Sequence, residues 1–182
     1  MLFNSKVIKM HSNSRVTNAS HSFIENMNGT SSIETASGTT HIVNVNGRSR
    51  ISRICDLACV LNLQDYSYIG RATDSSCVYV MYDYCNMGIL DAEARVLRMY
   101  GESSITEMTG TSVVQRMADK SSIGYMKDNS RVEEVTLSDA YIVKVDSTAS
   151  IDKYLGCSVP EGLDITDDQL YKNRRVVLNK LE

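Results

Sequence analysis

A stretch rich in serine, threonine and asparagine, residues 11–50, is the feature that most limits how this chain can fold. It holds 19 Ser, Thr or Asn residues, only five charged ones, and a few scattered apolar side chains. Ordering a backbone costs about 1–2 kcal/mol per residue, and so few apolar side chains cannot offset that cost. We find neither the charge of typical disorder nor a repeat in it. We therefore expect residues 1–47 to form a polar N-terminal arm, extended or strand-forming, that is ordered only against another surface.

Residues 48–182 contain apolar patterns that predict three helices and a compact core. The first helix is expected within residues 50–64, the second within 89–101 with Gly101 as its stop, and the third within 111–126. For residues 89–101 the second arm of a hairpin is the alternative, and the helix is preferred. In the first and third helices, apolar or small residues recur at helical spacing. The residues that carry this pattern are Ile51, Ile54, Cys55, Ala58 and Leu61 in the first helix, and Val114, Met117, Ala118, Ser121 and Tyr125 in the third.

Other segments of this part predict strands and two more helices. His41–Val45 alternates like a strand before the turn pair Asn46-Gly47, and residues 77–85 are rich in Val and Tyr. Residues 131–147 predict two strands about Ser138-Asp139. A short helix is expected at 149–156, and an amphipathic helix within 164–182. Because no strand–helix–strand alternation is evident, we predict the α+β class, with one domain over residues 48–182 ending in that amphipathic helix.

Composition and charge exclude several classes of function. The formal net charge is −3, which offers no general attraction to nucleic acid, so a nucleic-acid partner is not expected. No apolar run is long enough to span a membrane, and the first residues lack the apolar core of a signal peptide. Five cysteines do not suggest a disulfide framework in a chain of this size. We therefore expect an intracellular, reducing location or a virion, and no secretion through a signal peptide.

The histidines do not predict a metal site. His11, His21 and His41 all lie in the polar arm, and none is two to five residues from a cysteine or another histidine. We interpret them as structural or solvent-facing. A histidine base acting on a cysteine nucleophile stays open as a weaker alternative, without support from local spacing. No bound metal and no cofactor are expected.

The cysteines are interpreted as buried, reduced thiols. Cys55 and Cys59 are four residues apart on an expected helix, a spacing that could supply two metal ligands. Such a site would need two more ligands from Cys77, Cys85 and Cys157, the other cysteines of the chain. The neighbours of the first pair are apolar, and free cysteine packs as a small apolar group. A redox role is the other alternative.

Three short stretches follow the order of a known catalytic signature. "YIGRAT" contains Arg71, "TGTS" ends at Ser112, and "VEEVTL" contains Glu134. In that order they resemble the ADP-ribosyltransferases of the Arg/Ser/Glu type, although Val132 stands where the first glutamate of the family's Glu-x-Glu motif would be. The resemblance implies a small intracellular enzyme with Arg71, Ser112 and Glu134 as its catalytic residues. Glu133, beside Glu134 on a strand, would point to the opposite face.

The preferred interpretation is a non-catalytic structural or interaction subunit of a larger protein assembly. A polar arm that needs a partner surface, many half-buried tyrosines and the lack of a catalytic signature favour it. We expect other protein subunits as partners, in a homo-oligomer or a multi-protein assembly. A virion component, of the capsid, neck or tail, is the example that fits such an arm best.

Overall fold

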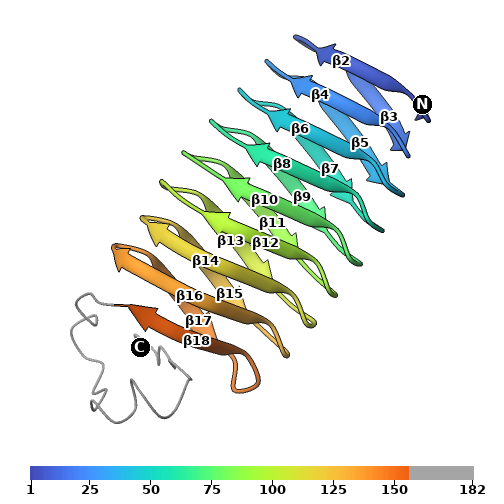
Figure 1. Cartoon of the computed structure of the whole chain (residues 1–182). Coiled ribbons are helices and arrows are strands. Elements are labelled where there is room, and N and C mark those ends of the chain that lie inside the picture. Colours follow the sequence, from blue (N-terminus) through green and yellow to red (C-terminus); the bar gives the residue numbers. More distant parts are fainter. Residues whose placement is uncertain (156–182) are drawn as a thin grey trace.

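The computed structural model describes residues 1–155, and this part of the chain contains strands and no helix. The strands form two nine-stranded parallel sheets, and the chain passes from one sheet to the other after every strand. The result is a parallel β-solenoid, an elongated stack of coils with the N-terminus at one end (Figure 1). No helix long and apolar enough to cross a membrane occurs in the described residues.

Sheet A contains the odd-numbered strands: β1 (Leu2–Phe3), β3 (Arg15–Ser20), β5 (Ser32–Ser37), β7 (Arg50–Ile54), β9 (Tyr68–Ala72), β11 (Asn86–Leu90), β13 (Ser104–Met108), β15 (Ser122–Met126) and β17 (Tyr141–Val145). Sheet B contains the even-numbered strands: β2 (Lys6–Met10), β4 (Phe23–Met27), β6 (His41–Val45), β8 (Cys59–Leu63), β10 (Cys77–Met81), β12 (Arg95–Met99), β14 (Val113–Asp119), β16 (Arg131–Ser138) and β18 (Ser150–Leu155).

A nine-residue repeat builds this solenoid, two repeats to a coil. In the repeats from Ser22 to Ala140 a small buried residue precedes the strand, and two apolar residues of the strand face the core; Ser49, Ile51 and Ile54 show the pattern. Between the two core residues, two consecutive residues face outward, so the strands do not alternate strictly. Partners in neighbouring strands of one sheet lie 18 residues apart through the middle of the solenoid, as Asn26 and Asn44 do, 17 apart in the first coils and 19 apart in the last ones.

The predicted α+β class is wrong, because the repeat imitates helical spacing. Ile51, Ile54 and Ala58 are all buried and stand at i, i+3 and i+7, as on one face of a helix. Val60, two residues later, is also buried, which one helix face does not allow. The expected helix at 50–64 is therefore β7, a turn and β8.

The other expected helices are also strands and turns where the structure describes them. Residues 89–101 belong to β11, β12 and their turns, and residues 111–126 form β14 and β15. Ser150–Leu155, within the expected short helix, is β18. The strand His41–Val45 and the strand pair around residues 138 and 139 are confirmed as β6, β16 and β17. The expected helix at 164–182 lies outside the described residues.

The polar N-terminal stretch is the first part of the solenoid and not an arm beside an α+β domain. Residues 1–47 contain β1 to β6, whose sheets continue into the coils that follow. Ile24, Ile33 and Ile42 are completely buried, and Ile24 pairs with Ile42 in sheet B. The surface that orders this stretch is therefore the next coil of the same chain. The conclusion that the stretch contains no repeat was wrong.

The turns between sheets repeat one backbone conformation. Every ninth residue from position 29 to position 128 has a positive φ, which only glycine adopts freely and which aspartate tolerates better than most residues. Glycine or aspartate fills every one of these positions except one, which is Ala92. The positions are Gly29, Gly38, Gly47, Asp56, Asp65, Asp74, Asp83, Ala92, Gly101, Gly110, Asp119 and Asp128.

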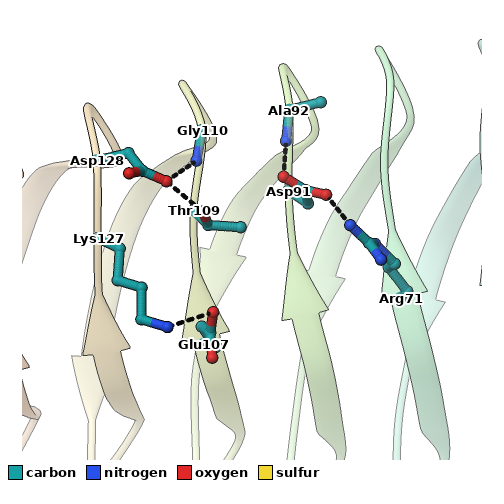
Figure 2. A network of polar contacts seen from close by, with 8 residues as sticks. All are labelled: Arg71, Asp91, Ala92, Glu107, Thr109, Gly110, Lys127 and Asp128. Carbon is teal, nitrogen blue, oxygen red and sulfur yellow. Dashed lines mark hydrogen bonds and ion pairs between the residues drawn. The ribbon is translucent and has the colours of Figure 1, made fainter.

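Aspartates in these turns also join one coil to the next. Asp65 Oδ2 accepts a hydrogen bond from the backbone N–H of Gly47 at 2.8 Å, and Asp56 Oδ2 accepts one from Gly38 at the same distance. Figure 2 shows the equivalent bond between Asp128 and Gly110. Because an aspartate both tolerates the turn conformation and caps a free amide, it serves the fold twice at this position.

Candidate functional site

A row of chemically reactive side chains lies on the outer face of sheet B. The row follows the first residue of successive strands, so its members lie in direct register. Phe23 of β4 pairs with His41 of β6, His41 pairs with Cys59 of β8, and Cys59 pairs with Cys77 of β10. Arg95 of β12 continues the row beyond Cys77. The register thus places one imidazole and two thiols on three neighbouring strands; these three, His41, Cys59 and Cys77, are called the thiol–imidazole row below.

Direct contacts hold this row together. His41 Nδ1 lies 2.9 Å from Cys59 Sγ, and the imidazole stacks on the ring of Phe23 with centroids 5.8 Å apart and an interplanar angle of 7°. The stacking restrains the plane of the imidazole, and its Nδ1 edge faces the thiol. His41, Cys59 and Cys77 are all half-buried.

Burial keeps the thiols of the row protonated at neutral pH. It raises the pKa of Cys59, and it raises the pKa of Cys77 to about 11, with a smaller contribution from the charge that Cys59 would carry as a thiolate. The Arg95 guanidinium acts in the opposite direction on the pKa of Cys77. Neither thiol is therefore an activated nucleophile, and their chemistry requires a partner that displaces the protons.

The remaining described cysteines lie elsewhere. Cys55 and Cys85 are buried, and burial raises the pKa of Cys85 to about 12. All four cysteines in residues 1–155 are free thiols, as expected, but Cys59 and Cys77 face outward and are not core residues. Cys157 lies outside the described part of the chain.

Two further rows run beside the thiol–imidazole row on sheet B. Asn26, Asn44 and Asn62 form an amide ladder, in which each Nδ2 donates to the Oδ1 of the preceding asparagine at 2.9 Å. Between this ladder and the thiols stands a row of large apolar side chains that face outward, called the apolar row below. It consists of Val43, Leu61, Tyr79 and Leu97, one from each of β6, β8, β10 and β12.

A second group of potential metal ligands occurs in the turns. Donor atoms of Cys55, Asp56 and Asp74 lie within 4.8 Å of one another. Their atoms already take part in the turn structure: Asp74 Oδ2 accepts from the Asp56 amide at 3.2 Å, and the Cys55 thiol donates to the carbonyl of Ala36 at 3.7 Å. We therefore assign this group to the aspartate ladder of the turns.

The three residues suggested by the transferase resemblance are not brought together. Arg71 lies on β9 of sheet A and forms an ion pair with Asp91, as Figure 2 shows. Ser112 is completely buried where the chain enters β14. Glu134 lies on β16 of sheet B and forms ion pairs with Arg116 and Lys153.

Glu133 and Glu134 do not point to opposite faces of their strand. Val132 and Val135 are buried on either side of them, while both glutamates are half-buried. The two consecutive outward positions of the repeat explain this difference from a strictly alternating strand. The predicted separation of the two carboxylates was therefore wrong.

Sequence reasoning missed the thiol–imidazole row because it considered only local spacing. His41 and Cys59 are 18 residues apart, and so are Cys59 and Cys77. The nine-residue repeat was the signal that could have found them, since Ser31-x-Ile33, Thr40-x-Ile42 and Ser49-x-Ile51 are visible in the sequence. A repeat of known period predicts which residues lie side by side in neighbouring coils.

Comparisons with known proteins do not identify a family. No protein-family model, no curated protein and no solved structure matches the chain.

Proposed function

We propose that this chain is a non-catalytic structural and interaction subunit of a larger protein assembly, and that it associates through the outer face of sheet B. The apolar row on this face is the observation that carries the proposal. Each member of this row follows the one before it by 18 residues, and Tyr79 is 42% exposed. Val43, Leu61 and Leu97 are half-buried, and a run of apolar side chains left partly open to solvent is a feature of many protein–protein contact surfaces.

The construction of the solenoid supports an architectural role. Each coil is bound to its neighbours by parallel ladders in both sheets, and side-chain ladders of asparagine and aspartate reinforce them. Such a quasi-one-dimensional stack presents its outer rows at fixed spacing along its length. A subunit of a virion, in the capsid, neck or tail, is the example we favour, because such particles need many copies of rigid, non-catalytic chains.

Sedimentation velocity over a wide concentration range tests the proposal. We expect the full chain to form a defined oligomer, and the double variant Leu61→Lys, Leu97→Lys to sediment as a monomer with an unchanged far-ultraviolet circular dichroism spectrum. Ser52→Lys, Thr106→Lys is the matched control, because these two exposed residues hold the same repeat position on sheet A. A native chain that is monomeric throughout, or a Leu61/Leu97 variant that sediments like the native chain, would contradict the proposal.

A further inference from the structure

We propose that two stacked pairs of tyrosines, Tyr66 with Tyr84 and Tyr82 with Tyr100, are sites of oxidative cross-linking. A one-electron oxidant of the haem-peroxidase class, supplied with hydrogen peroxide, joins each pair through a carbon–carbon dityrosine bond. The four tyrosines lie in the turns that lead from β8 to β9, from β10 to β11 and from β12 to β13. This modification goes beyond the proposed architectural function and does not depend on it.

The two rings of each pair lie face to face. The centroids of Tyr66 and Tyr84 are 5.3 Å apart, with an interplanar angle of 7°. Those of Tyr82 and Tyr100 are 5.5 Å apart, with an interplanar angle of 19°. The members of each pair hold the same place in successive coils. Each phenol therefore has a second phenol as its ring neighbour, which is the arrangement that radical coupling requires.

Backbone hydrogen bonds hold the two segments of each pair in register. The N–H of Tyr84 donates to the carbonyl of Asp65 at 3.1 Å, and the N–H of Tyr100 donates to the carbonyl of Met81 at 2.9 Å. Each acceptor residue directly precedes the stacking partner of the donor. The backbones of a pair are thus kept side by side, while exposed side chains change rotamer rapidly. The rings can therefore turn until their edges meet without any change in the coils.

The rings are open to an oxidant in solution. Tyr66 is 62% exposed, Tyr84 54% and Tyr82 38%, and Tyr100 is half-buried. A phenoxyl radical formed on one of these rings already has its partner in place, whereas a tyrosine of a second chain must arrive by diffusion. We therefore expect coupling within the chain to exceed coupling between chains in dilute solution.

The coupling reaction balances with hydrogen peroxide as the oxidant. The activated peroxidase removes one electron and the phenolic proton from each ring, and the two phenoxyl radicals join through the ring carbons next to their oxygens. The hydrogen on each of these carbons then leaves as a proton, and a proton returns to each oxygen, which restores both phenols. Two electrons and two protons have left the pair, and they reduce one molecule of hydrogen peroxide to two molecules of water.

Exposure alone does not define these sites. Tyr141 is 55% exposed, as open as Tyr84, but its partner in the neighbouring strand is Ser122. Tyr68 is paired in register with Arg50, whose guanidinium lies 5.0 Å from the centroid of the tyrosine ring. Oxidation of either ring gives a radical whose neighbour in register is not a phenol. We therefore expect neither Tyr141 nor Tyr68 to form a cross-link within the chain.

Oxidation of the full chain by a haem peroxidase with limiting hydrogen peroxide tests the proposal. Dityrosine fluorescence measures the yield, and mass spectrometry of the digested product identifies the linked residues. We expect both cross-links, Tyr66–Tyr84 and Tyr82–Tyr100, within one chain. Their yield should not change when the protein is diluted, because each coupling is intramolecular.

Phenylalanine variants assign the two bonds. Tyr66→Phe should remove the first cross-link and leave the second, Tyr100→Phe should do the reverse, and the double variant should lose both. Phenylalanine keeps the ring and its stacking, so we expect a native circular dichroism spectrum for each variant. Tyr141→Phe is the matched control, because it removes an equally exposed tyrosine and should leave both cross-links.

Three results would overturn the proposal: a native chain that forms no dityrosine, a native chain whose dityrosine joins only separate chains, or a folded double variant that retains the native yield. Leu61 and Leu97, whose substitution tests the assembly, belong to neither tyrosine pair. The cross-links are identified by their residues and the assembly by sedimentation, so the two proposals can fail separately.

Discussion

Asp128 Oδ2 accepts a hydrogen bond from the backbone N–H of Gly110 at 3.1 Å, and the two residues hold the same place in successive coils (Figure 2). Both have a positive φ, of 54° and 66°. The hydroxyl of Thr109 donates to the same carboxylate, and these two hydrogen bonds, that from Thr109 first, lower the pKa of Asp128. One residue type thus closes a turn and ties that turn to the coil before it.

Substitutions at Asp65 should separate these two roles. Asp65→Ala removes the acceptor for the Gly47 amide. It also leaves an alanine at a φ of 58°, where no side-chain hydrogen bond offsets the strain. We therefore expect a loss of about 1–2 kcal/mol in the free energy of unfolding. Asp65→Gly should lose less, because glycine adopts this φ without strain, and Asp65→Asn least. Urea unfolding of the three variants measures the order. Equal stability of the alanine and asparagine variants would contradict it.

Ala92→Gly should stabilise the protein. Ala92 has a φ of 55° at a turn position that otherwise holds glycine or aspartate, and relief of this strain is worth about 1 kcal/mol. Ala118→Gly is the control, because Ala118 lies in β14 with an ordinary φ and should lose stability on the same change. Thermal unfolding of both variants is the measurement. A lower midpoint for Ala92→Gly than for the native chain would refute this account of the turn.

Ser112→Ala should leave stability unchanged or raise it by up to about 1 kcal/mol. The Ser112 hydroxyl is buried and has no hydrogen-bond partner among residues 1–155, and a buried polar group without a partner is costly. Thr40→Ala is the contrast: its hydroxyl bonds to the carbonyls of Ser37 at 2.7 Å and Ala19 at 3.0 Å, so we expect a loss of about 1 kcal/mol or more. Chemical unfolding that showed equal losses for both variants would be inconsistent with these environments.

Asp91 should make stability sensitive to acid. Its pKa is lowered, first by the hydrogen bond from Arg71, so its contribution is complete above the ordinary carboxyl value of about 3.9 and is lost as the pH falls through the lower folded value. Asp91→Asn should therefore be less stable than the native chain at pH 7, and the difference should shrink in acid. Urea midpoints across the acid range measure this, with Glu93→Gln as control. A difference that stays constant with pH would exclude the ion pair as its source.

The sequence correctly predicted a strand where the apolar residues alternate. It predicted helices wrongly where the nine-residue repeat places apolar residues at helical spacing. His41–Val45 is short, bounded by an Asn-Gly turn pair and correctly predicted. Val114, Met117 and Ser121 are buried at i, i+3 and i+7, so a helix and two repeats of a solenoid explain them equally well. Only a comparison over several nine-residue repeats distinguishes the two, because the period of the repeat, and not the local spacing, sets the fold.

The candidate site was beyond local sequence reasoning for the same reason. Cys59 was grouped with Cys55 because four residues separate them, yet Cys55 is buried at a turn and Cys59 faces outward on β8. The contact between Cys59 and His41 arises from coil-to-coil register. Once the 18-residue period is known, the thiol–imidazole row follows from the sequence alone.

Deletion of one complete coil tests the 18-residue repeat most directly. Removing residues 67–84 joins Tyr66 to Cys85, which restores the turn and places β11 where β9 began. Removing residues 67–79 instead brings Val80 to the small buried position and breaks the register between the coils before the junction and those after it. By urea unfolding and circular dichroism, we predict that the first variant unfolds cooperatively with a native-like β spectrum and that the second does not fold. Equal folding of both variants, or failure of both, would contradict the repeat.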